Sequence, residues 1–166
     1  VVFMDDFQSL GWKYYASLGL ASTTGWVEDG ELYCVDWAYD RNSERFKVSY
    51  LKHEARHLAD YERFPGLDAV DLEYRAKLTE LAFAHHSAIR LLEDFISKSA
   101  ENPNSPHAMA NFRVTRDLQL ELNGSKESPA EDSWHQVSVS SLNLAARKLL
   151  IRNTTALSAE PAANGN

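Results

Sequence analysis

The 166-residue chain has a single cysteine, Cys34, and no long apolar run. One thiol cannot form a disulfide within the chain, and it leaves the redox compartment open, because cytosolic and exported chains can both look like this. No stretch of about 18 apolar residues is present to cross a bilayer. The first residues also lack the basic flank and the apolar stretch of a signal peptide. We therefore expect no membrane span, and the sequence indicates no particular localisation.

Clustered positive charge is also missing. The chain has 17 Lys and Arg against 24 Asp and Glu, which gives a formal net charge of −7. No basic stripe is available for a phosphate backbone, so nucleic acid is not expected as a partner. Hydrophobic residues make up 44% of the chain, which is enough for one compact core. We predict a single domain over residues 1–157 and a disordered tail over residues 158–166.

The N-terminal quarter predicts a hairpin preceded by less regular sequence. Residues 1–25 mix aromatic residues with glycines and hold no lasting period, and we assign them loosely to a short helix. From Trp26 to Trp37, polar and apolar residues alternate around Asp29-Gly30, a dipeptide suited to a tight turn. This pattern predicts a β-hairpin.

Helical periods dominate the middle of the chain. Apolar residues at three- and four-residue steps predict a helix over about 45–63, which Pro65-Gly66 ends. Asp68 is suited to cap a second helix that runs to about Ser99 and is the longest predicted element.

Two further helices are predicted before the C-terminus. Ser105 as N-cap and Pro106 at the first helical position start one of them, and Asn123-Gly124 ends it. The other runs over roughly 137–153. The predicted fold class is therefore α+β, with a small hairpin or sheet packed beside about four to five helices.

The segment His53-Glu54-Ala55-Arg56-His57 carries the most chemical information. Residues four apart on a helix point in nearly the same direction, so the two imidazoles can share one metal ion. Glu54 flanks the position where a water would sit, which is where a general base is useful. Two His and one Glu at this spacing arise by chance in roughly one chain of this length in a hundred.

Residues 53–57 resemble the His-Glu-x-x-His motif of the zincin metallopeptidases. The resemblance implies a zincin-like fold and one zinc ion held by His53, His57 and a third protein ligand. The metzincin pattern, a Gly and then a His or Asp soon after the second His, is not found in residues 58–63. In the gluzincin branch the third ligand is a Glu on a second helix after a turn. Here that implies Glu73, with Glu80 as the alternative.

The neighbours of the motif leave two questions open. Residues between the paired His of zincins are generally uncharged, whereas Arg56 stands there in this chain. Its position is rotated away from the two His, so it either faces outward or pairs with an acidic neighbour. The Glu that is not a ligand could orient a ligating His, as could Asp60 or Asp71.

The resemblance implies a zinc-dependent metallopeptidase that acts on a peptide or protein substrate, with Glu54 as general base. Gluzincins commonly place a His or Tyr from a later helix at the developing oxyanion, and His107 is our candidate, with His135 as the other. His107 also fits a hydrogen-bonded position at the edge of the core. The predicted hairpin is similar to the zincin strand region in which an edge strand binds an extended peptide.

Two other functions remain as alternatives. The first is a catalytically inactive, zinc-binding interaction domain derived from a zincin. The second is a di-iron helical site, because Glu54-x-x-His57 also has the Glu-x-x-His spacing of carboxylate bundles. That site needs a second pair, and the nearest one is Asp132-x-x-His135.

Overall fold

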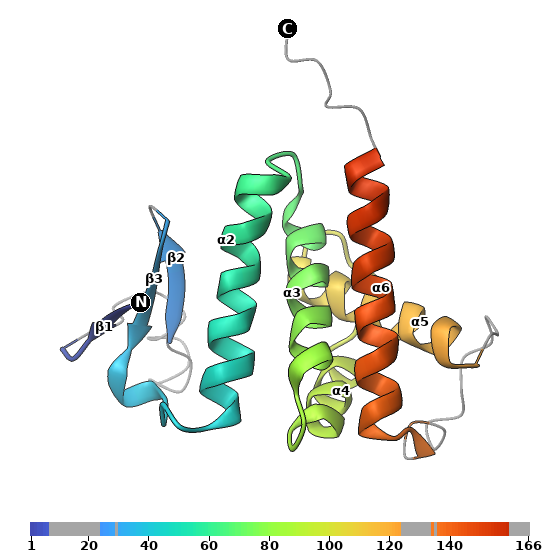
Figure 1. Cartoon of the computed structure of the whole chain (residues 1–166), viewed down its shortest axis with the longest axis horizontal. Helices are drawn as coiled ribbons and strands as arrows, with labels where there is room; N and C mark the ends of the chain where they lie inside the picture. The colour runs from blue at the N-terminus through green and yellow to red at the C-terminus, as the bar shows by residue number, and fades with distance from the viewer. Residues whose placement is uncertain (7–23, 29, 124–133, 135, 160–166) are drawn as a thin grey trace, which may run out of the picture.

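A small β-sheet lies at one end of the molecule, and helices form the rest (Figure 1). The computed structural model describes residues 1–6, 24–28, 30–123, 134 and 136–159. The described part holds strands β1 to β3, helices α2 to α6, a 3₁₀ turn, η1 (Asp36–Ala38), and a π-helix, η2 (Arg45–Lys52). The predicted α+β class is confirmed, with helix as the main component.

The sheet has three strands among the described residues, in the order β1-β3-β2. β2 (Gly25–Glu28) and β3 (Glu31–Val35) are antiparallel and form the predicted hairpin. Glu28 pairs with Glu31, and Gly30 in the turn has φ +77°, a conformation that glycine adopts without strain.

The strand β1 (Val2–Met4) runs parallel to β3 and was not predicted. The loosely assigned N-terminal helix is wrong for these three residues, because β3 offers them a pairing partner that lies about 30 positions away along the chain. The prediction is also wrong at residues 5, 6, 24 and 25, none of which is helical, and residues 7–23 lie outside the described part.

The helix that carries the motif occupies its predicted place. It begins as a π-helix, η2 (Arg45–Lys52), and continues without a break into α2 (His53–Arg63). At the junction the backbone N–H of His53 donates to the carbonyl of Val48, five residues back, as well as to that of Tyr50. The π-helical half was not predicted, since apolar periodicity does not separate the two kinds of helix over so short a segment.

The predicted long helix from Asp68 to Ser99 is two helices, so that prediction is wrong. They are α3 (Ala69–Phe83) and α4 (Ala88–Ser97). Asp68 does cap the first, because its side chain accepts a hydrogen bond from the backbone N–H of Asp71.

The break between α3 and α4 is held by side chains from distant parts of the chain. The amide of Asn143 donates to the carbonyls of Leu81 and Ala84 at 2.5 and 2.9 Å. The carboxylate of Glu44 accepts from the backbone N–H groups of His85 and Ser87 at 2.6 and 2.7 Å. These bonds satisfy backbone groups that a helix break would otherwise leave without partners.

The two C-terminal helices follow the prediction at their starts. α5 spans Pro106–Asn123, as predicted, and α6 spans Val139–Ala159. α6 therefore extends two residues into the predicted tail, whose remaining residues, 160–166, lie outside the described part. None of the helices in the described ranges combines the length and apolar character needed to cross a membrane.

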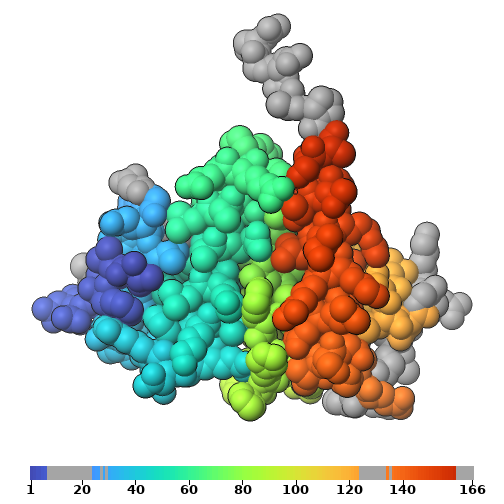
Figure 2. Space-filling view, viewed as in Figure 1, coloured from blue at the N-terminus to red at the C-terminus, as the bar shows by residue number. Residues whose placement is uncertain are grey.

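The central element is α3, which contacts α2, α4, α5, α6 and η2. In the space-filling view it shows only as a narrow green strip between its neighbours (Figure 2). The apolar side chains of α3 belong to the main hydrophobic core. The fully buried members of this core include Leu78, Leu81, Leu92, Val114, Leu118 and Leu142. Because α3 is buried on nearly all sides, its polar residues must find partners on the helices around it.

The sheet is joined to the motif helix by Tyr50 of η2. Its hydroxyl donates to the carbonyl of Tyr33 in β3 at 2.6 Å, and its ring packs with Phe46 and Cys34 in a second, smaller core. A Cβ added at Gly25 would lie only 2.2 Å from Cε2 of Tyr50. Glycine is therefore needed at position 25 for the hairpin to approach the helix this closely.

Candidate metal centre

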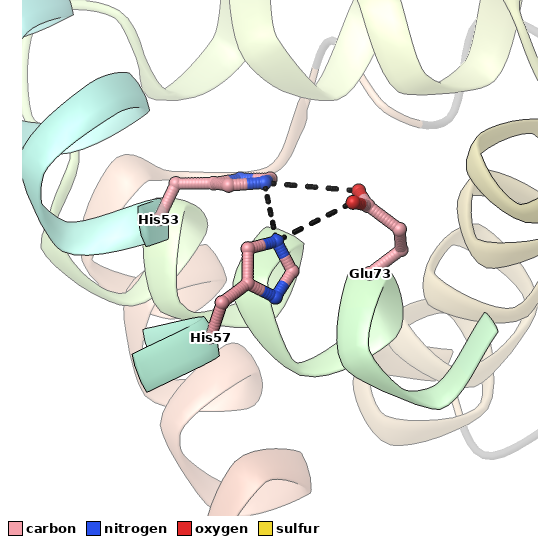
Figure 3. A group of neighbouring side chains, drawn as sticks. All are labelled: His53, His57 and Glu73. Atoms are coloured by element: carbon pink, nitrogen blue, oxygen red, sulfur yellow. Dashed lines mark hydrogen bonds and ion pairs between the residues drawn. The ribbon is translucent and has the colours of Figure 1, made fainter. Parts of the chain in front are cut away.

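The side chains of His53, His57 and Glu73 converge between α2 and α3 (Figure 3). The two Nε2 atoms are 3.1 Å apart. Nε2 of His53 lies 3.7 Å from Oε2 of Glu73, and Nε2 of His57 lies 3.4 Å from its Oε1. All candidate donor atoms fall within 4.8 Å of one another, so this cluster could hold a metal ion.

The spacing of these donors suits a four-coordinate cation. Metal–nitrogen and metal–oxygen bonds of about 2 Å at tetrahedral angles place ligand atoms about 3.3 Å apart. The separations of 3.1, 3.4 and 3.7 Å lie on both sides of that value. Oε2 of Glu73 and Nδ1 of His57 are buried without a hydrogen-bond partner among the described residues. The donor set therefore fits a bound cation.

Glu80, the alternative third ligand, takes a different place. Its Oε1 accepts a hydrogen bond from Nδ1 of His53 at 2.8 Å, on the side of the ring opposite to the cluster. A carboxylate in this position fixes the orientation of the imidazole and leaves Nε2 free to bind a metal. The geometry thus favours Glu73 as ligand and Glu80 as the group that orients His53.

The charges of the cluster favour a cation at its centre. Burial disfavours a charged His53, but the carboxylates of Glu73 and Glu80 outweigh burial and raise the pKa of its imidazole to about 9. Burial also disfavours the charged form of Glu73 and by itself would raise its pKa. The imidazoles of His107, His53 and His57 outweigh this effect and hold the pKa of Glu73 well below the ordinary range. Positive charge is thus stabilised at this point, whether a proton or a metal ion carries it.

Glu54 lies beside the cluster without joining it. It makes no hydrogen bond or ion pair with the part of the chain that the structure describes. Burial raises the pKa of its carboxyl group, and the carboxylates of Glu73 and Glu80 add to this, while His53 and His57 oppose it. Its charge also raises the pKa of Tyr39 and Tyr50, on the side of the sheet, although burial is the main cause there.

His107, the candidate oxyanion donor, is brought to the cluster by the first turn of α5. Its Nδ1 lies 2.8 Å from Oε2 of Glu73, in a contact that lacks hydrogen-bond geometry, and its side chain is 73% exposed. It is therefore an exposed neighbour of the third ligand, outside the core. Its role toward an oxyanion stays a prediction.

Arg56 points away from the two His. Its Nε donates to the hydroxyl of Thr79 at 3.0 Å, and its Nη1 lies 3.7 Å from Asp60. The charge inside the motif thus serves the contact between α2 and α3, and it pairs with an acidic neighbour, one of the two predicted orientations.

A buried ion pair next to the metal cluster was missed by the sequence analysis. Arg75 donates through Nε and Nη2 to the two oxygens of Asp60 at 2.7 and 2.9 Å, and both side chains are only 1% exposed. Its Nη1 also donates to Asn153 and Thr154 of α6. The Asp60–Arg75 pair therefore links α2, α3 and α6. Asp60 does not orient a ligating His. Asp60 and Arg75 lie on different helices, 15 positions apart in the sequence, so no short-range spacing predicts that they pair.

Of the three remaining candidates, the structure describes only Asp71. Asp71 accepts from Nη1 of Arg113 at 2.7 Å and does not approach the imidazoles. Asp132 and His135, the second pair of the di-iron alternative and the other oxyanion candidate, lie outside the described residues.

The motif, its helix and the carboxylates around it can also be compared with known proteins. No protein-family model, curated protein or solved structure matches this chain.

Proposed function

We propose that the protein is a zinc metallopeptidase with a zincin-like fold of the gluzincin type. One observation carries the proposal: His53, His57 and Glu73 converge at ligand spacing while Glu54 stays unpaired beside them. This combination separates metal ligands from a general base, as hydrolysis by an activated water requires. Two imidazoles and one carboxylate, with one position left for water, are the ligands of catalytic zinc sites.

The roles of the chain's own residues follow from their places. His53, His57 and Glu73 would hold the zinc, which supplies a water of pKa about 7 and polarises the substrate carbonyl. Glu54 accepts the proton of the attacking water and passes it to the leaving amine. Glu80 keeps His53 in the orientation that presents Nε2 to the metal.

The sheet supports a peptide as substrate. β2 is an edge strand among the described strands, and it is the strand that contacts α2. An extended peptide can pair with such an edge through main-chain hydrogen bonds, which leaves its side chains free for selection. A peptide bound along β2 would lie beside the helix that carries His53 and Glu54.

Metal analysis and peptide hydrolysis test the proposal together. We expect one zinc per chain at neutral pH and cleavage of an internally quenched peptide mixture. Glu54→Gln should keep the zinc and lose activity about 100-fold or more. Glu62→Gln, which changes an exposed glutamate on the same helix, is the matched control and should leave activity unchanged.

Absence of stoichiometric zinc would contradict the proposal at its first step. Zinc binding without hydrolysis of any peptide in the mixture would contradict the peptidase and leave the alternative of a non-catalytic metal-binding domain.

A further inference from the structure

A pocket of about 760 Å³ opens between η2, α3 and α4. It lies next to the candidate metal site formed by His53, His57 and Glu73. Glu80 belongs to both, because it lines the pocket and also accepts from Nδ1 of His53. On the motif helix, Arg45 and Ser49 of the pocket precede His53 by eight and four residues. The pocket thus adjoins the candidate metal site through Glu80.

Lys77 is the buried basic residue in the wall of this pocket. Its side chain is 9% exposed, and Nζ lies 4.0 Å from Oε2 of Glu73 and 4.6 Å from the centroid of the Phe95 ring. Among the described residues no acceptor lies within hydrogen-bond distance of it. An ammonium has three N–H donors, and a buried charge is costly unless it is hydrogen-bonded. Lys77 is therefore a buried cation whose donors remain available to a ligand in the pocket.

Two of the three carboxylates that line the pocket already have partners. Asp94 is paired with Lys98 at the rim at 2.6 Å, and Glu80 is engaged by His53. Arg90 also lines the pocket and has no ion-pair partner in the described ranges. Glu93 is the one lining carboxylate without a partner there. Lys77 and Arg90 thus offer donors to an anion, and Lys77 does so close to the metal cluster.

We propose that Lys77 is a specificity-determining residue that binds a carboxylate of the substrate beside the bond that is cut. This inference rests on the proposed peptidase function and names its substrate class: peptides with a carboxylate within reach of the pocket. The carboxylate is either the C-terminal carboxylate or an Asp or Glu side chain. When Glu73 ligates the metal, its charge is shared with the metal, and Lys77 is left to pair with the substrate.

Binding of matched ligands tests the role of Lys77 without turnover. The protein is the zinc-loaded Glu54→Gln variant, and the measurement is calorimetric titration with two ligand pairs. One pair is acetyl-Gly-Phe with a free C-terminus against its amide, and the other is acetyl-Gly-Glu-amide against acetyl-Gly-Gln-amide. We expect the charged member of one pair to bind about tenfold tighter or more, as for a hydrogen-bonded ion pair. The pair that shows the difference identifies the source of the carboxylate.

Variants of Lys77 separate this residue from the general charge of the pocket. Lys77→Met should abolish the preference for the carboxylate while keeping the zinc, and Lys77→Arg should retain most of it. Lys98→Gln is the matched control, because it removes the same charge from the same pocket at a side chain that is 66% exposed. We expect it to change the preference less than twofold.

Several outcomes would overturn the inference. Equal binding within each ligand pair would do so even if Lys77→Met failed to fold, because that comparison needs no change at Lys77. Equal losses in Lys77→Met and Lys98→Gln would show a diffuse field instead of a binding residue. A wild type that cleaves peptides without preferring a carboxylate contradicts this inference alone. Carboxylate-selective binding without any turnover contradicts the proposed peptidase alone.

Discussion

Two polar clusters lie side by side between α2 and α3, and they differ in how completely their groups are satisfied. In the first, Asp60 and Arg75 saturate each other and α6 completes the contact. In the second, His53, His57 and Glu73 lie 3.1 to 3.7 Å apart, and buried atoms of His57 and Glu73 keep no hydrogen-bond partner in the described chain. Both occupy the same interface, so burial alone does not account for the difference.

The difference separates a structural cluster from one that is built for a ligand. A buried group without a hydrogen bond lowers stability, and native proteins hold few of them. The unpaired Oε2 of Glu73, together with the ligand spacing of the three side chains, indicates a cluster that could hold an ion. The Asp60–Arg75 pair is satisfied by its own hydrogen bonds and by α6, and it joins the two helices that carry His53, His57 and Glu73.

The largest effect should come from breaking the saturated cluster. Arg75→Met leaves the Asp60 carboxylate buried and without its bidentate partner, which typically costs about 3–5 kcal/mol in the free energy of unfolding. Urea denaturation followed by circular dichroism measures this loss. Arg116→Met, which removes an ion-paired arginine that is 53% exposed, is the control and should change stability by about 1 kcal/mol or less.

A double substitution sharpens this prediction. Asp60→Leu combined with Arg75→Met removes both charges and should recover a large part of the stability lost in the single variant. If the single Arg75→Met variant were as stable as the wild type, the pair could not be what holds α2 against α3.

Metal should stabilise the unsaturated cluster. At a free zinc concentration about 100 times the dissociation constant, the folded state gains about 2.7 kcal/mol, seen as a higher melting temperature. Glu73→Gln should lose most of this gain, because a neutral amide is a poor replacement for a carboxylate ligand. The Arg116→Met control should keep all of it, and a gain unchanged in Glu73→Gln would place the metal elsewhere.

Glu80 should matter for affinity and much less for stoichiometry. Glu80→Gln weakens the group that orients His53 but leaves all three ligands in place, so we expect zinc to bind about 10- to 100-fold more weakly at one ion per chain. Competition with a chromophoric chelator measures this affinity. Loss of the bound zinc altogether would exchange the roles assigned to Glu73 and Glu80.

The smallest effect is expected at Glu44, a carboxylate that backbone N–H groups satisfy. Burial raises the pKa of Glu44, but the hydrogen bonds from His85 and Ser87 outweigh it and lower the pKa below its ordinary 4.5. A lowered folded-state pKa stabilises the protein above pH 4.5, and this stabilisation is lost as the pH falls through the folded pKa.

Glu44→Gln should therefore cost about 1 kcal/mol at pH 7 and progressively less below pH 4.5. Thermal unfolding of the variant and the wild type across this range measures the difference. A cost that is independent of pH would show that it does not arise from the charge of the Glu44 carboxylate, and no cost at all would show that the amide accepts these hydrogen bonds equally well.

Local features could be predicted from the sequence because their determinants lie within a few residues. The turn at Gly30, the cap at Asp68 and the start of α5 at Pro106 each depend on one or two residue types at fixed positions. The metal cluster belongs to this group in part, since His53 and His57 are neighbours on one helix. Glu73 was found through a resemblance, and its approach to the imidazoles required the structure.

The remaining features depend on partners far away in the sequence. The break between α3 and α4 is held by Glu44 and Asn143, which are 41 to 62 positions from the groups they bind. In the sequence, Asp60 and Arg75 look like ordinary exposed residues of two helices. In the folded chain both are buried, and α6 packs against the pair. Lys77 likewise lies among positions that look solvated in the sequence and is buried only because α4 packs over it.

The contact of Tyr50 with Gly25 and Tyr33 limits which substitutions the chain can accept at position 25. Any side chain at position 25 would displace the Tyr50 ring, and Tyr50 stands three residues before the first metal ligand. The tolerance of the site to substitution is thus set partly in the sheet, at a residue with no functional atom of its own. Among related chains we expect positions 25 and 50 to change together, so that their covariation would trace the attachment of the hairpin to the metal-binding helix.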